Sequence, residues 1–188
     1  MSRDENRSSC WLARLAATAV LLRRNQRGMA AIEFGFFAGF LSYAILNAAE
    51  IAVYLYQRME VENATEMGAQ AAAKNCTISQ LPATVNCAAL SNAVQKAVQS
   101  TSLGTNVSLQ SGSPSEGYYC VNSSNALVYV SSVSSKPADC TAAGMPSLQP
   151  GDYIKIQTTY SYAPLFSGLT VGGKFTTPIT RTALMRLG

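Results

Sequence analysis

The stretch that decides the fold lies at residues 23–34 and begins with the basic cluster Arg23-Arg24-Asn25-Gln26-Arg27. Gly28 follows the cluster, and Met29-Ala30-Ala31-Ile32-Glu33-Phe34 then opens a long, mostly apolar run. Because placing a carboxylate in lipid costs free energy, an acid at the start of such a run is expected to have a function. The spacing suggests one: cleavage after Gly28 would make Glu33 the fifth residue of a new chain, whose amine it could neutralise.

The apolar run predicts a membrane-spanning helix over residues 29–56. Its last 22 residues (35–56) would measure about 33 Å as a helix, which is enough to cross the hydrocarbon core. The alternative is a buried helix of a soluble protein. Tyr54 and Tyr56 at the far end, followed by Arg58, are typical of the interface between membrane and water and favour the membrane.

The net charge of +4 lies entirely before this run. Residues 1–28 carry six arginines against Asp4 and Glu5, whereas residues 29–188 carry eight basic and eight acidic side chains. A basic leader beside an apolar span predicts a cytoplasmic N-terminus and an external C-terminal part. The neutral C-terminal part argues against nucleic acid as a partner.

The leader contains a second apolar run, residues 11–22, which is too short to span a membrane. It is either the hydrophobic region of a secretory signal or a short arm at the inner membrane surface. The arm is favoured because no small-x-small cleavage site follows the run.

The cysteines fit the predicted topology. Cys10 is alone in the leader, while four cysteines lie beyond the span in a compartment that permits disulfides: Cys76, Cys87, Cys120 and Cys140. Three pairings are possible. We favour Cys76–Cys87 with Cys120–Cys140, because each bridge closes a short, polar loop. Zinc is the alternative, but no cysteine pair has C-x-x-C spacing.

The chain contains no histidine, which excludes Ser-His-Asp and Cys-His catalysis and histidine-bound zinc. The carboxylates outside the helical region, Glu116, Asp139 and Asp152, are scattered. We therefore expect no enzyme, no cofactor and no metal.

Beyond the span the helix is expected to continue over residues 57–75, with Ala64, Met67 and Ala71 on an apolar face. The remainder, residues 76–188, predicts a periplasmic domain. A short amphipathic helix is expected over residues 87–102, and β-strands over 107–110, 118–121, 126–133, 153–162 and 174–185. The predicted fold is α+β: a long N-terminal helix, transmembrane and then amphipathic, followed by a small antiparallel sheet and a second short helix.

The junction resembles the processing signal of prepilin-type substrates, and specifically the TadE-like family of tight-adherence (Flp-type) pilus assembly. The matching features are the basic leader, Gly28, the acid Glu33 with Phe34, the apolar stretch, and Glu50 near its outer end. The alanine-rich tail of the helix (69–74) and the segments 160–166 and 180–186 also resemble this family. The resemblance covers residues 24–75 and 153–186.

This resemblance implies that the protein is a minor pilin or pseudopilin, a structural component of pilus assembly. A prepilin peptidase would cut between Gly28 and Met29, removing residues 1–28. The mature protein would remain in the bacterial inner membrane, or enter a pilus, with other pilins and the assembly platform as partners. Glu33 would pair with the new amine of Met29 in the same or a neighbouring subunit, although an acid at a helix N-terminus is also favourable by itself.

At 100° per residue, one stripe of the helix contains a small-residue pair and an acid: Gly35, Gly39, Tyr43, Leu46 and Glu50. A GxxxG pair lets another helix approach closely, and a buried partner would spare Glu50 from lipid. The stripe therefore predicts a helix–helix interface, the alternative being a chance GxxxG.

Two rival functions remain from the sequence. The tyrosines beyond the membrane suit either sheet packing or binding to a surface, so a tip adhesin that uses residues 76–152 is one rival. A membrane-anchored periplasmic hydrolase that uses the scattered carboxylates is the other.

Overall fold

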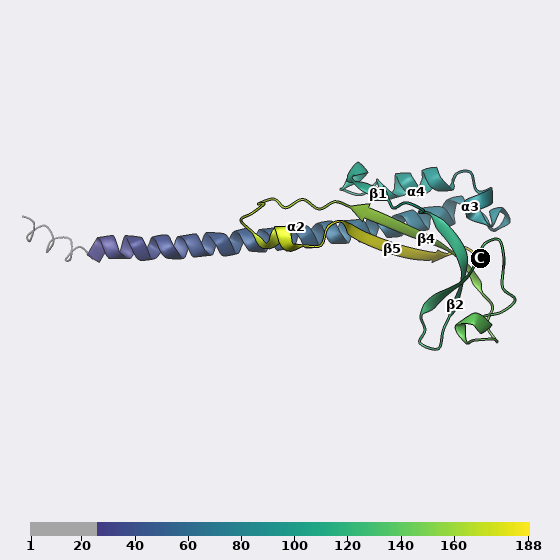
Figure 1. The fold of residues 1–188 in the computed structure, drawn as a ribbon. Helices are drawn as coiled ribbons and strands as arrows, with labels where there is room; N and C mark the ends of the chain where they lie inside the picture. Colours follow the sequence, from purple (N-terminus) through teal and green to yellow (C-terminus); the bar gives the residue numbers. More distant parts are fainter. Residues whose placement is uncertain (1–25) are drawn as a thin grey trace, which may run out of the picture. The chain divides into compact units, whose positions relative to one another are not determined.

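The computed structural model describes residues 26–188, so the leader arm at residues 1–22 and Cys10 lie outside the described residues. The described chain is α+β, as predicted from the sequence (Figure 1). Its helices and strands are α2 (Gln26–Asn75), α3 (Ala83–Asn86), α4 (Leu90–Val98), β1 (Val107–Leu109), β2 (Ser115–Val121), β3 (Leu127–Ser132), β4 (Gly151–Tyr160) and β5 (Ile179–Arg186). Four short 3-10 turns lie between them: η1 (Ile78–Gln80), η2 (Gly104–Asn106), η3 (Thr141–Ala143) and η4 (Val171–Lys174).

Helix α2 is 50 residues long and contains no proline. The chain divides into two compact units between Ala48 and Ala49. In the first unit the helix exposes large apolar side chains on every side, with Phe34, Phe36, Phe37 and Phe40 each at least 73% exposed. A helix that is apolar all round requires a membrane or other helices around it. Within residues 26–188, α2 is the one helix long and apolar enough to cross a membrane.

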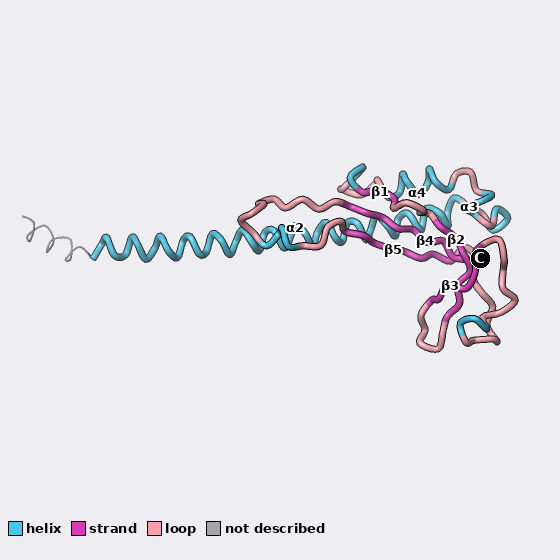
Figure 2. The backbone as a smooth tube through the Cα atoms, in the orientation of Figure 1, coloured by secondary structure: helices cyan, strands magenta, loops and turns pink. Residues whose placement is uncertain are grey.

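The second unit contains an antiparallel sheet built on β4 (Figure 2). One edge of β4 pairs with β5 over eight residues, and the other edge pairs first with β2 and then with β1. Strand β3 pairs with β2 as a hairpin. Five strands had been predicted in these places. The last begins at Ile179 instead of Lys174, because residues 171–174 form η4.

One face of the sheet packs on α2 and is alternately buried, as the period of a strand requires: Ile154, Ile156 and Thr158 on β4 are all fully buried. Gly68 of α2 marks the closest approach. A Cβ there would lie 2.8 Å from Val98 of α4 and 3.3 Å from Ile156 of β4, so only glycine lets the three elements meet.

The predicted apolar face of the helix extension is partly wrong. Ala64 is buried, but Ala71 is only half-buried and Met67 is 42% exposed. The buried positions are Val61, Ala64, Thr65, Gly68, Ala69 and Ala72. Small residues at these spacings let the strand lie close, whereas the longer Met67 points away. The second short helix runs over Leu90–Val98, within the predicted range 87–102, and buries Leu90, Val94 and Val98 on one side.

The folded unit begins earlier than the predicted boundary at residue 76. Residues 49–75 of α2 belong to it. Tyr54, assigned above to the membrane interface, stacks on Phe175 with ring centroids 4.5 Å apart. The Tyr56 hydroxyl lies 3.1 Å from the hydroxyl of Ser102. The apolar stretch outside the folded unit therefore ends near Ala48, about 31 Å of helix from Gly28.

Candidate functional site

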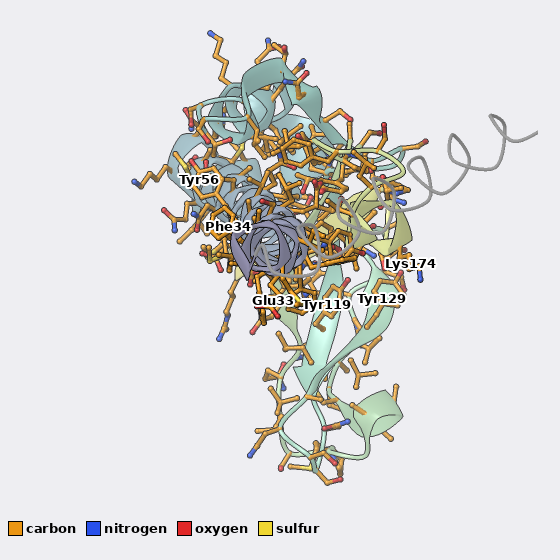
Figure 3. The ribbon with its side chains drawn as sticks, turned by 90° about the vertical axis from the view of Figure 1, so that its left-hand side faces the viewer. Glu33, Phe34, Tyr56, Tyr119, Tyr129 and Lys174 are labelled. Carbon is orange, nitrogen blue, oxygen red and sulfur yellow. A yellow bond between two sulfur atoms is a disulfide. The ribbon has the colours of Figure 1, made fainter. Side chains whose placement is uncertain are left out.

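The predicted processing site lies on the first turns of the described helix. Met29 is 63% exposed and Phe34 is 75% exposed, and Glu33 is exposed as well. Figure 3 shows Glu33 and Phe34 projecting outward from α2. These side chains have the accessibility that a peptidase or a neighbouring subunit needs.

The small residues of the predicted helix–helix stripe lie in open space. A Cβ added at Gly35 or Gly39 would meet no atom within 4 Å. Tyr43 is 54% exposed and Leu46 is half-buried. In this single chain, the surface around Gly35 and Gly39 is therefore open to the helix of another subunit. The pairing of helices there stays a prediction.

Glu50, the last residue of that stripe, lies in a site of its own. Its side chain is fully buried. Its carboxylate accepts hydrogen bonds from the Tyr162 hydroxyl, from the backbone N–H groups of Leu165 (3.0 Å) and Phe166 (3.2 Å), and from the Thr170 hydroxyl (3.3 Å). Four donors from one short segment thus surround one carboxylate on α2. We call this segment, residues 162–173, the β4–β5 loop.

The packing around the carboxylate is equally close. Gly172 in η4 lies so near that a Cβ there would sit 2.6 Å from Glu50 Oε1. The Tyr162 ring makes an edge contact with Tyr54, with centroids 5.0 Å apart. Burial raises the pKa of the Tyr162 phenol, and the hydrogen bond to Glu50 raises it further. Tyr162 therefore stays protonated and donates to the carboxylate.

This arrangement corrects the prediction that Glu50 faces a partner helix. The acid is buried, but its partners come from its own chain, at a separation of 112–120 residues. A buried carboxylate must be paired or hydrogen-bonded, and the β4–β5 loop meets that need. Glu50 fastens the loop to the first turn of the folded unit.

The two disulfides are Cys76–Cys87 and Cys120–Cys140, with Cα atoms 5.7 Å apart in each. This is the pairing favoured from the sequence. The first bridge joins the end of α2 to the segment before α4, and the second joins β2 to the start of η3. All four sulfur atoms are therefore in disulfides, where zinc cannot bind them as thiolates.

The structure also brings together two carboxylates that the sequence left apart. Glu116 on β2 accepts hydrogen bonds from the Ala83 and Thr84 N–H groups (2.8 and 2.7 Å) and from the Thr84 hydroxyl (2.7 Å). Asp152 on β4 is 6% exposed, and its Oδ1 has no hydrogen-bond partner in the described chain. Burial, and then the neighbouring Glu116, raise the pKa of Asp152 to about 6. Glu116 therefore has a structural role as the acceptor for the first N–H groups of α3.

The third scattered carboxylate, Asp139, lies in the loop before η3. It accepts the backbone N–H of Thr141 at 2.9 Å, and hydrogen bonds from Thr141 lower its pKa. It is therefore a turn residue in this fold.

Sequence reasoning missed the residues that donate hydrogen bonds to Glu50 and pack around its carboxylate. The sequence analysis places Tyr162 at the end of a predicted strand and in a segment that resembles the family, but it does not single out Thr170 or Gly172. An unpaired acid at the end of an apolar run signals that donors exist, but the sequence gives no sign of where. The Gly172-Gly173 pair is the one local feature that predicts a close approach of the backbone.

Comparison of the chain with models of known protein families, with curated proteins and with solved structures found no match.

Proposed function

We propose that this protein is a minor pilin or pseudopilin of a tight-adherence pilus system, similar to the TadE-like family. In this proposal a prepilin peptidase removes residues 1–28, and the mature chain stays in the bacterial inner membrane with its folded unit in the periplasm. It then takes part in assembly with other pilins and the assembly platform. Its role is structural, with no catalysis and no cofactor.

The observation that carries the proposal is the division of α2. Residues 28–48 are mostly apolar and largely exposed, whereas residues 49–75 contribute to the core of a disulfide-bonded α+β unit. A pilus subunit keeps the apolar half of its helix in a membrane and later packs that half among other helices, while the other half holds the folded unit. One helix with both an exposed apolar half and a folded half meets these two needs. The exposed Gly28, Met29 and Glu33 at the start of this helix supply the cleavage signal.

Cleavage is the first test. The full chain is expressed in cells with and without a prepilin peptidase, and its intact mass and N-terminal sequence are measured. We expect a chain that starts at Met29 only when the peptidase is present. Replacing Gly28 by leucine should block cleavage, while the control Gly39→Leu, at another exposed glycine of the same helix, should be cut normally. A chain that starts at Met1 in all cells refutes the proposal.

Assembly is the second test. The Glu33→Ala variant should be cleaved but should reduce the number of pili, because the new amine of Met29 loses its counter-ion. Glu66→Ala is the matched control, since Glu66 is an exposed acid on the folded half of the same helix. Normal piliation with Glu33→Ala would exclude the amine-pairing role.

A tip adhesin is the second candidate, and one observation favours it. On the sheet, Tyr119 makes edge contacts with Tyr129 and Tyr153, with centroids 5.5 and 5.7 Å apart. Tyr129 is 54% exposed, and Figure 3 shows Tyr119 and Tyr129 side by side. Exposed aromatic groups of this kind suit contact with a surface. Adhesion that falls with Tyr129→Ala while pilus number stays normal would support this candidate.

A further inference from the structure

The β4–β5 loop ends in a turn with an unusual surface. The turn covers residues 165–169 and is closed by a hydrogen bond of 3.2 Å from the Leu169 N–H to the Phe166 carbonyl. Leu165 is 59% exposed and Leu169 is 66% exposed. Gly168 has a φ of +81°, a conformation that side chains disfavour. The turn is thus well defined, and its two leucines are held outward.

The turn is held at a fixed position along α2. The carboxylate of Glu50 accepts the N–H groups of Leu165 and Phe166 and the hydroxyl of Thr170. These contacts lie inside the second unit, at its first helical turn. Figure 1 shows the connection between β4 and β5 beside α2.

The position of Glu50 along the helix sets the height of the turn. The exposed apolar stretch from Gly28 to Ala48 is about 31 Å long, close to the thickness of a hydrocarbon core. Glu50 is two residues beyond its end and therefore falls at the boundary between lipid and water. We propose that Leu165 and Leu169 insert into the outer surface of the bilayer that α2 crosses. This inference rests on the membrane span of the proposed function and adds a second lipid contact to it.

The chemistry of the turn favours lipid over a protein partner. Two leucines on a five-residue turn offer far less area than the roughly 1,000 Å² that a specific protein interface needs. A lipid boundary requires no matching shape and accepts apolar side chains singly. Lys174 follows the turn and is exposed, and Figure 3 shows it projecting outward. Its ammonium group is suited to anionic headgroups.

The contact would fix the folded unit against the membrane. A single helix allows the unit above it to rotate and tilt, whereas a second contact beside the helix restricts both motions. The hydrogen bonds at Glu50 transmit this restriction directly to α2. The face that the subunit offers to its neighbours would then be set before assembly.

Fluorescence of the full chain in vesicles tests the inference. Trp11 is the one tryptophan, so Trp11→Phe gives a silent background for the reporter Leu169→Trp. The vesicles contain phosphatidylcholine and phosphatidylglycerol, with and without bromine on the upper acyl carbons. Ile78→Trp is the matched negative control, because Ile78 is 76% exposed and lies beyond the far end of α2. Phe37→Trp, in the apolar stretch, reports whether the helix itself has inserted.

We expect the brominated lipid to remove about half of the Leu169→Trp emission, as for a side chain at the acyl boundary, and to leave Ile78→Trp unchanged. Leu165→Trp should behave like Leu169→Trp and serves if that variant does not form its disulfides. Quenching of Phe37→Trp alone would overturn the lipid contact while leaving the span intact. Absence of quenching at all positions would overturn the span as well. Protection of the reporter only after another pilin is added would also overturn the inference, in favour of a protein partner.

Discussion

Replacing Thr65 by valine should destabilise the folded unit, because Thr65 and Thr158 form a buried hydrogen-bonded pair between α2 and β4. Their hydroxyl oxygens are 2.6 Å apart, and the Thr65 hydroxyl also donates to the Val61 carbonyl at 2.6 Å. Thr65 is 1% exposed and Thr158 is fully buried. Valine keeps the volume and the branching of threonine, so the change removes the polar interaction with little effect on packing.

The size of the effect follows from what each change leaves behind. Thr65→Val leaves the Thr158 hydroxyl buried without its partner, which costs about 1–3 kcal/mol. Thr158→Val should cost less, about 0.5–1.5 kcal/mol, because Thr65 keeps its bond to the Val61 carbonyl. The double variant removes both hydroxyl groups and should be close to the original protein in stability. The pair is therefore strongly non-additive.

Thermal unfolding of the full chain in detergent, followed by the near-ultraviolet circular dichroism of its tyrosines, measures the difference. For a chain of this size, Thr65→Val should lower the melting temperature by about 3–10 °C, and the second substitution should restore most of the loss. The exposed pair Thr180→Val and Thr182→Val on β5 is the control and should give small, additive changes. A double Thr65/Thr158 variant less stable than both single variants would refute the reasoning.

Three further predictions concern charge, packing and covalent links. The pKa of Asp152 is raised to about 6 in the folded chain, so the folded state binds the proton more tightly than the unfolded state. The free energy of unfolding should therefore rise by about 1–2 kcal/mol as pH falls from about 6 to 4, after allowance for solvent screening. Chemical denaturation should show no such rise for Asp152→Asn. Gly172→Ala should increase amide exchange in the β4–β5 loop without affecting the sheet, because its Cβ would collide with Glu50, whereas Gly173→Ala, which has open space, should behave like the original. Replacing both cysteines of the β2–η3 disulfide by serine should cost about 2–4 kcal/mol in denaturant unfolding, and an unchanged midpoint would mean that the bridge is dispensable.

Much of the fold could be predicted from the sequence because its signals are local. The end of α2 at Asn75 follows from a proline-free, alanine-rich run that stops at Cys76. The alternation in residues 153–160 predicts β4, whose inward positions include Ile154 and Ile156. Short polar loops between cysteines indicated the disulfide pairing.

The partner of Glu50 could not be predicted for the opposite reason. Helical periodicity placed this acid on a stripe with Gly35 and Gly39, and periodicity gives the direction of a side chain but not what lies there. The donors come from a loop more than 110 residues later, where backbone N–H groups supply half of the bonds. A backbone donor has no residue type by which it can be recognised. The same limit concealed the proximity of Glu116 and Asp152, which depends on the register of β2 and β4.

The distance along the chain between Glu50 and its donors has a consequence for the order of synthesis. The apolar stretch and Glu50 are made long before the β4–β5 loop, so the carboxylate lacks its donors until about 110 further residues have been made. Contacts of such long range form late in folding. In the proposed topology, the nascent chain must therefore emerge on the outer side before the β4–β5 loop can reach Glu50. The hydrogen bonds at Glu50 then mark a subunit in which the ends of the folded unit have come together.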